Sequence, residues 1–144
     1  MSNDVDDPVE KAVQLHSDAL SALAEGALGR AQACATEALD VFEAESGAFH
    51  PDVANVLNCL THIHEQTSEY ASAEATAMRS VAIMRGVREQ AGGEDIDRLY
   101  VQSLTGLGDV VRIRGRYDEA EPYLREAIAI GDSIDPSLVG SFKI

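Results

Sequence analysis

Gly115-Arg116-Tyr117-Asp118-Glu119-Ala120-Glu121 has two related copies nearer the N-terminus of the chain. One is Ser68-Glu69-Tyr70-Ala71-Ser72-Ala73-Glu74, and a weaker one is Gly26-Ala27-Leu28-Gly29-Arg30-Ala31-Gln32. The alanines that anchor the copies, Ala31, Ala73 and Ala120, are separated by 42 and then by 47 residues. Self-similarity at a period of this length predicts a repeat architecture, in which each copy is one supersecondary unit.

Two further sets of positions keep the same register. A leucine stands 16 residues before each anchoring alanine, and aliphatic residues stand 8 and 10 residues after it. Within a copy, the interior positions recur at i, i+3, i+4 and i+7, a spacing that predicts an amphipathic helix. Leu57, Leu60, Thr61 and His64 form one such stripe, and Leu104, Leu107, Gly108 and Val111 form the equivalent one. At Gly108 we expect close packing against the neighbouring helix.

The predicted helix ends agree with this register. Asp7-Pro8 and His50-Pro51 each place a capping residue before a proline, which is typical of a helix start. Gly26, Ser68 and Gly115 stand where one helix must stop and turn into the next. We expect six helices, at residues 8–25, 28–46, 51–66, 70–90, 96–114 and 117–132, and no strands, because no segment alternates with period 2.

The composition restricts the function and location of the protein. The 144 residues are enough for about one domain, and 25 acidic against 11 basic residues give a net charge of −14. This charge disfavours nucleic acid as a partner, since such binding depends on basic residues that neutralise phosphates. The acidic start, the two isolated cysteines and the lack of a long apolar run predict a cytoplasmic protein without a membrane anchor.

The repeat resembles the tetratricopeptide repeat, in the longer variety of about 42 residues found in kinesin light chain. The resemblance rests on His50-Pro51-Asp52-Val53-Ala54 and Leu57-Asn58-Cys59-Leu60, together with the seven residues that begin at Gly115 and Ala127-Ile128-Ala129-Ile130. It implies an all-α, right-handed α-solenoid of antiparallel helix pairs. Its three repeats would occupy residues 8–47, 50–91 and 95–133, after an acidic tail at residues 1–7.

The C-terminal residues 134–144 resemble the start of a fourth repeat, because Asp135-Pro136-Ser137-Leu138-Val139 is similar to the opening of the second copy. Two interpretations stay open. In the favoured one the chain is a piece of a longer array. In the other, this is a natural end that another chain covers, and we expect a homodimer through the exposed residues Ile130, Ile134 and Leu138.

Catalysis has little support in the sequence. Cys59, His62 and His64 come nearest to a metal-binding set. On a helix, however, residues 62 and 64 point about 160° apart, so the three cannot converge on one ion. Cys34 and Cys59 are expected to be small core residues at helix interfaces. We therefore predict a protein that is not an enzyme, with no metal and no cofactor.

A binding role has more support. If the first helix of each copy buries its leucine stripe, the opposite stripe is free, and the resemblance implies that this stripe lies on a concave, peptide-binding surface. Its amides could bind a peptide backbone, and the acidity of the chain favours a basic partner. The expected groove residues are Val13, His16, Leu20 and Leu23 in the first copy, Asn55, Asn58, His62 and Glu65 in the second, and Gln102, Thr105, Asp109 and Arg112 in the third.

We therefore predict a scaffold that binds a peptide or helix of a partner protein. The alternative is a regulatory, sensor or self-association module of a longer multidomain protein, since the fold alone does not decide between these functions.

Overall fold

The computed structural model describes residues 7–134. Within this range the chain forms six helices and no strand, so the all-α prediction is confirmed. The helices are α1 (Pro8–Ala24), α2 (Leu28–Ser46), α3 (Pro51–Gln66), α4 (Tyr70–Gln90), α5 (Glu94–Ile113) and α6 (Tyr117–Ile134). Every predicted helix is present, and each predicted boundary is within two residues of the observed one.

Local chemistry explains where the helices begin. The Asp7 carboxylate accepts a hydrogen bond from the Val9 amide at 2.9 Å, which caps α1. The Nδ1 atom of His50 caps α3 in the same way, since it accepts from the Asp52 amide at 3.0 Å. Helix α5 has no side-chain cap, but its first turn is acidic, and this charge interacts favourably with the helix dipole. It therefore begins at Glu94, two residues before the predicted start.

The turn inside each helix pair has one geometry, repeated three times. Gly26, Ser68 and Gly115 have positive φ values of 79°, 61° and 84°. The amide that follows each of them donates to a carbonyl five residues back, at 2.8, 2.8 and 3.1 Å, which is the Schellman arrangement of a helix C-terminus. The left-handed conformation favours glycine, so the second repeat bears a conformational cost at Ser68.

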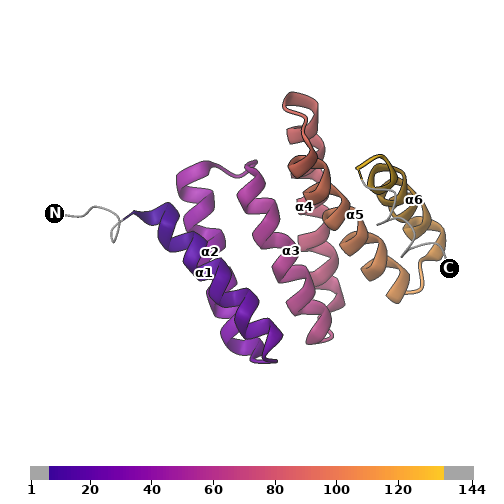
Figure 1. Cartoon of the computed structure of the whole chain (residues 1–144). Helices are drawn as coiled ribbons and strands as arrows, with labels where there is room; N and C mark the ends of the chain where they lie inside the picture. Colours follow the sequence, from indigo (N-terminus) through magenta and orange to yellow (C-terminus); the bar gives the residue numbers. More distant parts are fainter. Residues whose placement is uncertain (1–6, 135–144) are drawn as a thin grey trace.

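The three helix pairs stack into a curved solenoid (Figure 1). Each first helix packs on its own second helix, and α1 also contacts α3 while α3 contacts α5. In the described part of the chain, the backbones of α2, α4 and α6 do not approach one another in this way. The first helices therefore lie closer together than the second helices, which places α1, α3 and α5 on the inner side of the curve.

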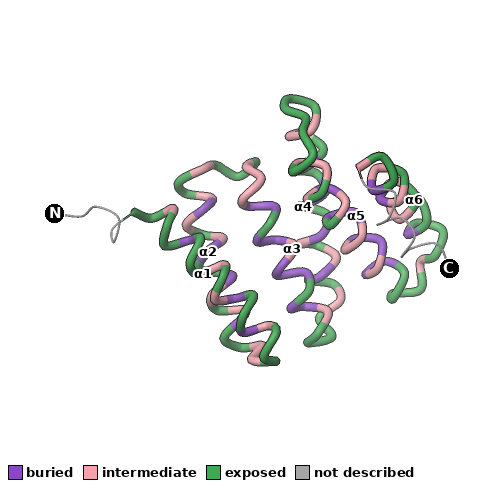
Figure 2. The backbone as a smooth tube through the Cα atoms, viewed as in Figure 1, coloured by how far each residue is buried: buried purple, intermediate pink, exposed green. Residues whose placement is uncertain are grey.

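The core lies between these helices (Figure 2). Ala31, Ala73 and Ala120, the anchors of the repeat, are 0%, 0% and 1% exposed. The predicted interior stripes of α3 and α5 are likewise buried. Small residues at the anchors let paired helices approach closely, because a larger side chain would not fit at native packing density.

Ion pairs join the second helices across the outer side. Arg79 of α4 contacts Glu43 of α2 at 2.9 Å, and Arg85 of α4 contacts Glu126 of α6 at 3.4 Å. Long charged side chains therefore span the wider gaps where the backbones diverge.

The C-terminal end differs in part from the prediction. Ile130 and Ile134 are half-buried instead of exposed, and Ile130 packs against the core. Leu138 and the expected fourth-repeat helix lie outside the described residues, as do residues 1–6 of the expected acidic tail.

Candidate functional site

The predicted groove residues form a grid of three columns on the inner side of the solenoid. The columns are α1, α3 and α5, and residues related by 42 and then 47 positions share a row. The α1 column is largely apolar, and the α3 column changes from amides to titratable residues. The α5 column changes from the neutral polar residues Gln102 and Thr105 to the charged residues Asp109 and Arg112. The four rows are Val13, Asn55 and Gln102; His16, Asn58 and Thr105; Leu20, His62 and Asp109; and Leu23, Glu65 and Arg112.

A hollow of about 680 Å³ crosses this grid. Ten of the twelve expected groove residues line it: His16, Leu20, Leu23, Asn55, Asn58, His62, Glu65, Gln102, Thr105 and Asp109. Val13 and Arg112 do not, because they occupy opposite corners of the grid and the hollow runs obliquely between the other two corners.

Four further residues line the hollow: Cys59, Thr61, Val101 and Gly106. Cys59 and Thr61 were predicted as interior residues, and both are buried. Val101 and Gly106 flank stripe or core positions of α5. A helical wheel assigns such flanking positions to neither face, so periodicity gives no strong indication of them.

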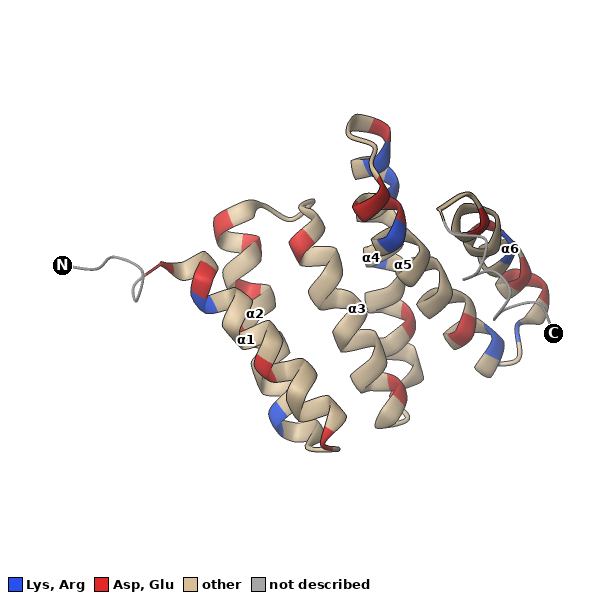
Figure 3. Cartoon of the chain, viewed as in Figure 1, with Lys and Arg blue, Asp and Glu red and all other residues tan. Residues whose placement is uncertain are grey.

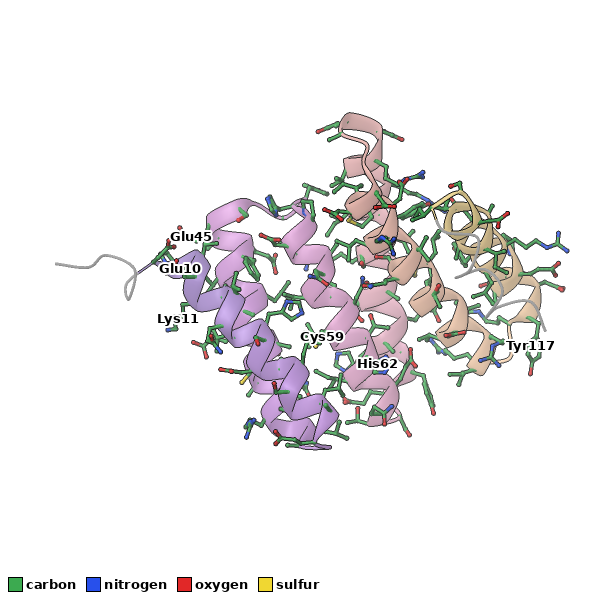
Figure 4. The ribbon with its side chains drawn as sticks, in the orientation of Figure 1. Glu10, Lys11, Glu45, Cys59, His62 and Tyr117 are labelled. Carbon is green, nitrogen blue, oxygen red and sulfur yellow. The ribbon has the colours of Figure 1, made fainter. Side chains whose placement is uncertain are left out.

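The α1 side of the hollow is apolar. Leu20 is 49% exposed, whereas Leu23 packs against the core; Val13, two turns before Leu20 on α1 and outside the hollow, is 55% exposed. Cys59 of α3 adds a buried thiol to this side (Figure 4). Burial raises the pKa of that thiol to about 11. The thiol therefore stays protonated near neutral pH and is a poor nucleophile.

Asn58 in the centre is held by two serines. Its Oδ1 atom accepts hydrogen bonds from Ser80 of α4 at 2.7 Å and from Ser103 of α5 at 3.2 Å. The two serine hydroxyls are also 2.7 Å apart and both are buried. The Asn58 Nδ2 group has no partner within the described residues. This Nδ2 group is itself buried, so Asn58 carries an unpaired donor beneath the hollow, with its acceptor side already satisfied.

The lower rows of the grid are titratable. Desolvation raises the pKa of Glu65, and the charge of Asp109 raises it further, against the opposing effects of His62 and Arg112. Desolvation also raises the pKa of Asp109, although Arg112 lies 3.7 Å away and opposes this shift. Two partly buried carboxylates of α3 and α5 therefore line the same hollow, and each would be stabilised by a cation.

The histidines lie on different faces. His62 is exposed on the hollow side (Figure 4), and His64 is buried between the helices, as predicted from the helical spacing. Desolvation lowers the pKa of His16 at the α1 side, so this ring is neutral near pH 7. Across residues 7–134, no three His, Cys, Asp or Glu side chains are arranged to hold a metal ion.

Every basic side chain that the structure describes has a carboxylate partner. The ten Lys and Arg residues between 7 and 134 each lie within 4.0 Å of an Asp or Glu, and the longest pair is Arg30–Glu25 at 3.9 Å. The arginines are concentrated on α4 to α6, whereas α1 and α2 are mainly acidic (Figure 3). Glu65 has no such ion pair. The hollow therefore offers uncompensated negative charge and no unpaired cation.

Residues 101–131, which form most of α5 and α6, match the family model of the tetratricopeptide repeat. The chain carries a tetratricopeptide repeat. The repeat register extends the same unit to the two preceding helix pairs. Tetratricopeptide arrays generally mediate protein–protein interaction, on concave surfaces formed by stacked repeats.

A solved structure of the same fold is that of BtubC (BKLC) from P. vanneervenii. It matches with a TM-score of 0.76 and 22% identity, over 86% of this chain and 48% of that chain. The chain thus spans about half the length of BtubC (BKLC), and at this identity the likeness concerns the fold. The predicted tetratricopeptide resemblance is confirmed by the family match at residues 101–131 and by the shared fold. A comparison with curated proteins finds no match.

Proposed function

We propose that this tetratricopeptide array is a non-enzymatic scaffold that binds a peptide or helix of a partner protein in the hollow across α1, α3 and α5. The observation that carries the proposal is the size and lining of the hollow. Its volume of about 680 Å³ is within the range of ligand sites, and its lining joins exposed apolar residues to oriented amides.

The amides support a peptide as the ligand. Asn55 and Gln102 are exposed at the upper row, and one row below them Asn58 has a buried amide donor without a partner. Each can bond to a peptide backbone, whose amide and carbonyl groups need partners when they leave water. Leu20 supports the same proposal, since a partner side chain that covers it would remove apolar surface from water.

Paired alanine variants test this function. Asn55→Ala with Gln102→Ala should change stability by less than about 0.5 kcal/mol, because both residues are exposed. The pair should weaken partner binding by about 1–3 kcal/mol, since polar groups of the partner would be buried unpaired. The control is Gln66→Ala with Gln90→Ala, two exposed amides outside the hollow. Equal affinity of both double variants for a partner captured by the chain would move the site away from the hollow.

A basic partner and a cytoplasmic location are further parts of the proposal. The net charge of −14 and the unpaired Glu65 favour a positively charged ligand, whose affinity should fall as salt rises. No helix within residues 7–134 is both long enough and apolar enough to cross a bilayer.

Self-association is the second candidate function, as part of a regulatory or sensor module. Ile130 and Ile134 on α6 retain partly exposed apolar surface at the last described turn of the solenoid. If this end pairs with a second copy, Ile134→Glu should shift a concentration-dependent dimer toward monomer in light scattering. A chain that is monomeric at all concentrations would exclude this second function.

A further inference from the structure

We propose that the hollow selects an extended segment in which an apolar residue and a Lys or Arg are four residues apart. The apolar side chain would bind beside Leu20 and Leu23 of α1, and the cation would bind between Glu65 and Asp109. This inference rests on the proposed peptide-binding function and specifies the residue types and the spacing of its ligand.

The charge of the site identifies the cation. Glu65 is partly buried without an ion pair to Lys or Arg, and Asp109 has only Arg112, at 3.7 Å. The other described basic residues are already paired with carboxylates. An acidic segment would therefore meet uncompensated negative charge, whereas a Lys or Arg would complement it.

The separation follows from the helix spacing. Packed helices lie about 8–10 Å apart, so the distance from α1 to a point midway between α3 and α5 is about 12–15 Å. An extended chain rises about 3.3 Å per residue, which makes this distance about four residues. Side chains four residues apart in an extended chain point to the same side. Both side chains can therefore enter the hollow at once.

A helical ligand would require a different pattern. A helix that lies along the groove would present apolar residues at i, i+3, i+4 and i+7 to an apolar strip. Only the α1 column of the grid is apolar, whereas α3 and α5 present amides and charges. The polarity of the lining therefore changes more from one helix to the next than along any one helix. This pattern favours a ligand that crosses the helices.

Selection from random 12-residue peptides displayed on phage tests the inference, with affinities of the selected peptides measured by fluorescence anisotropy. We expect enrichment of an aliphatic or aromatic residue four positions from Lys or Arg. Glu65→Gln should weaken these peptides about tenfold, the effect of one hydrogen bond to a charged group. Glu45→Gln, which removes the same charge from an exposed site on α2 (Figure 4), should leave affinity unchanged.

A charge reversal makes the test specific. Peptides selected for binding to the Glu65→Lys variant should carry Asp or Glu, in place of Lys or Arg, four positions from the apolar residue.

Three results would contradict the inference. Peptides that lose affinity in the Asn55→Ala, Gln102→Ala pair but bind Glu65→Gln normally would overturn it and leave the proposed function standing. Apolar residues at i, i+3 and i+7 without the cation would indicate a helical ligand, with the same consequence. Selected peptides that bind the Asn55→Ala, Gln102→Ala double variant with unchanged affinity would overturn both proposals.

Discussion

Gly108 of α5 lies directly against Leu124 of α6. A β-carbon at residue 108 would be 2.5 Å from Leu124 Cδ2 and 2.6 Å from Leu124 Cγ, which is too close for any side chain. The equivalent pairs are Thr61 with Ala77 in the second repeat, and Ala19 with Ala35 in the first. Each of the three pairs contains at least one small residue, which a close approach of two helices requires at native packing density.

This close contact predicts that the effect of Gly108→Ala on the free energy of unfolding changes sign when Leu124 is shortened. Gly108→Ala should destabilise the chain by about 1–3 kcal/mol, because Leu124 must leave its position. In a Leu124→Ala background the same substitution should stabilise by up to about 1 kcal/mol, since alanine favours helix over glycine. Urea unfolding of the four proteins measures both values. A destabilising Gly108→Ala in both backgrounds would show that Leu124 is not the obstacle.

Ala120→Leu should cost about 1–3 kcal/mol, because Ala120 is 1% exposed at the anchor of the third repeat. Ala129→Leu, an exposed position on the same helix, is the matched control and should change stability by less than about 0.5 kcal/mol. Thermal melts compare the two variants. Equal melting temperatures would mean that the anchor register is incorrect.

Asn58 and Ser103 should be energetically coupled. Asn58→Ala removes the acceptor of two serine hydroxyls, and Ser103→Ala removes one of the donors. Each single change should cost about 1 kcal/mol, and the double variant should cost less than the sum by about 0.5 kcal/mol or more. Chemical denaturation gives the coupling energy. Strict additivity would indicate that the serines bond only to the backbone carbonyls of Ala54 and Leu99.

Glu74 should confer stability that depends on pH. Hydrogen bonds from Arg116 lower the pKa of this carboxyl, and Arg114 adds to the effect, at distances of 2.6 and 2.8 Å. A lowered pKa favours the folded state above the unfolded pKa of about 4.3, and this stability is lost as pH falls through the folded value.

Glu74→Gln should therefore destabilise by about 1–3 kcal/mol at pH 7, since only 13% of the Glu74 side chain is exposed. The difference from the original chain should shrink toward zero below about pH 4. Urea melts at pH 7 and pH 3 measure it. A difference that is the same at both pH values would assign the effect to packing instead of charge.

The helices and their register followed from local chemistry. Proline after a capping residue, a residue that tolerates positive φ at the turn, and a buried residue every three or four positions act over a few residues, so the order of amino acids alone predicts them. The repeated alanines identified the fold for the same reason. The Glu94 start of α5 was missed by two residues, because an acidic first turn can begin a helix without a cap.

Only the tertiary structure decided how the first helices share one surface. The oblique course of the hollow, which includes Val101 and Gly106 and leaves out Val13 and Arg112, depends on how each pair is rotated against the next. The serine support of Asn58 comes from two other helices, 22 and 45 residues away in the chain. The raised pKa values of Glu65 and Asp109 depend on burial between α3 and α5. Helical periodicity assigns a residue to a face, but distances between faces arise from packing across repeats.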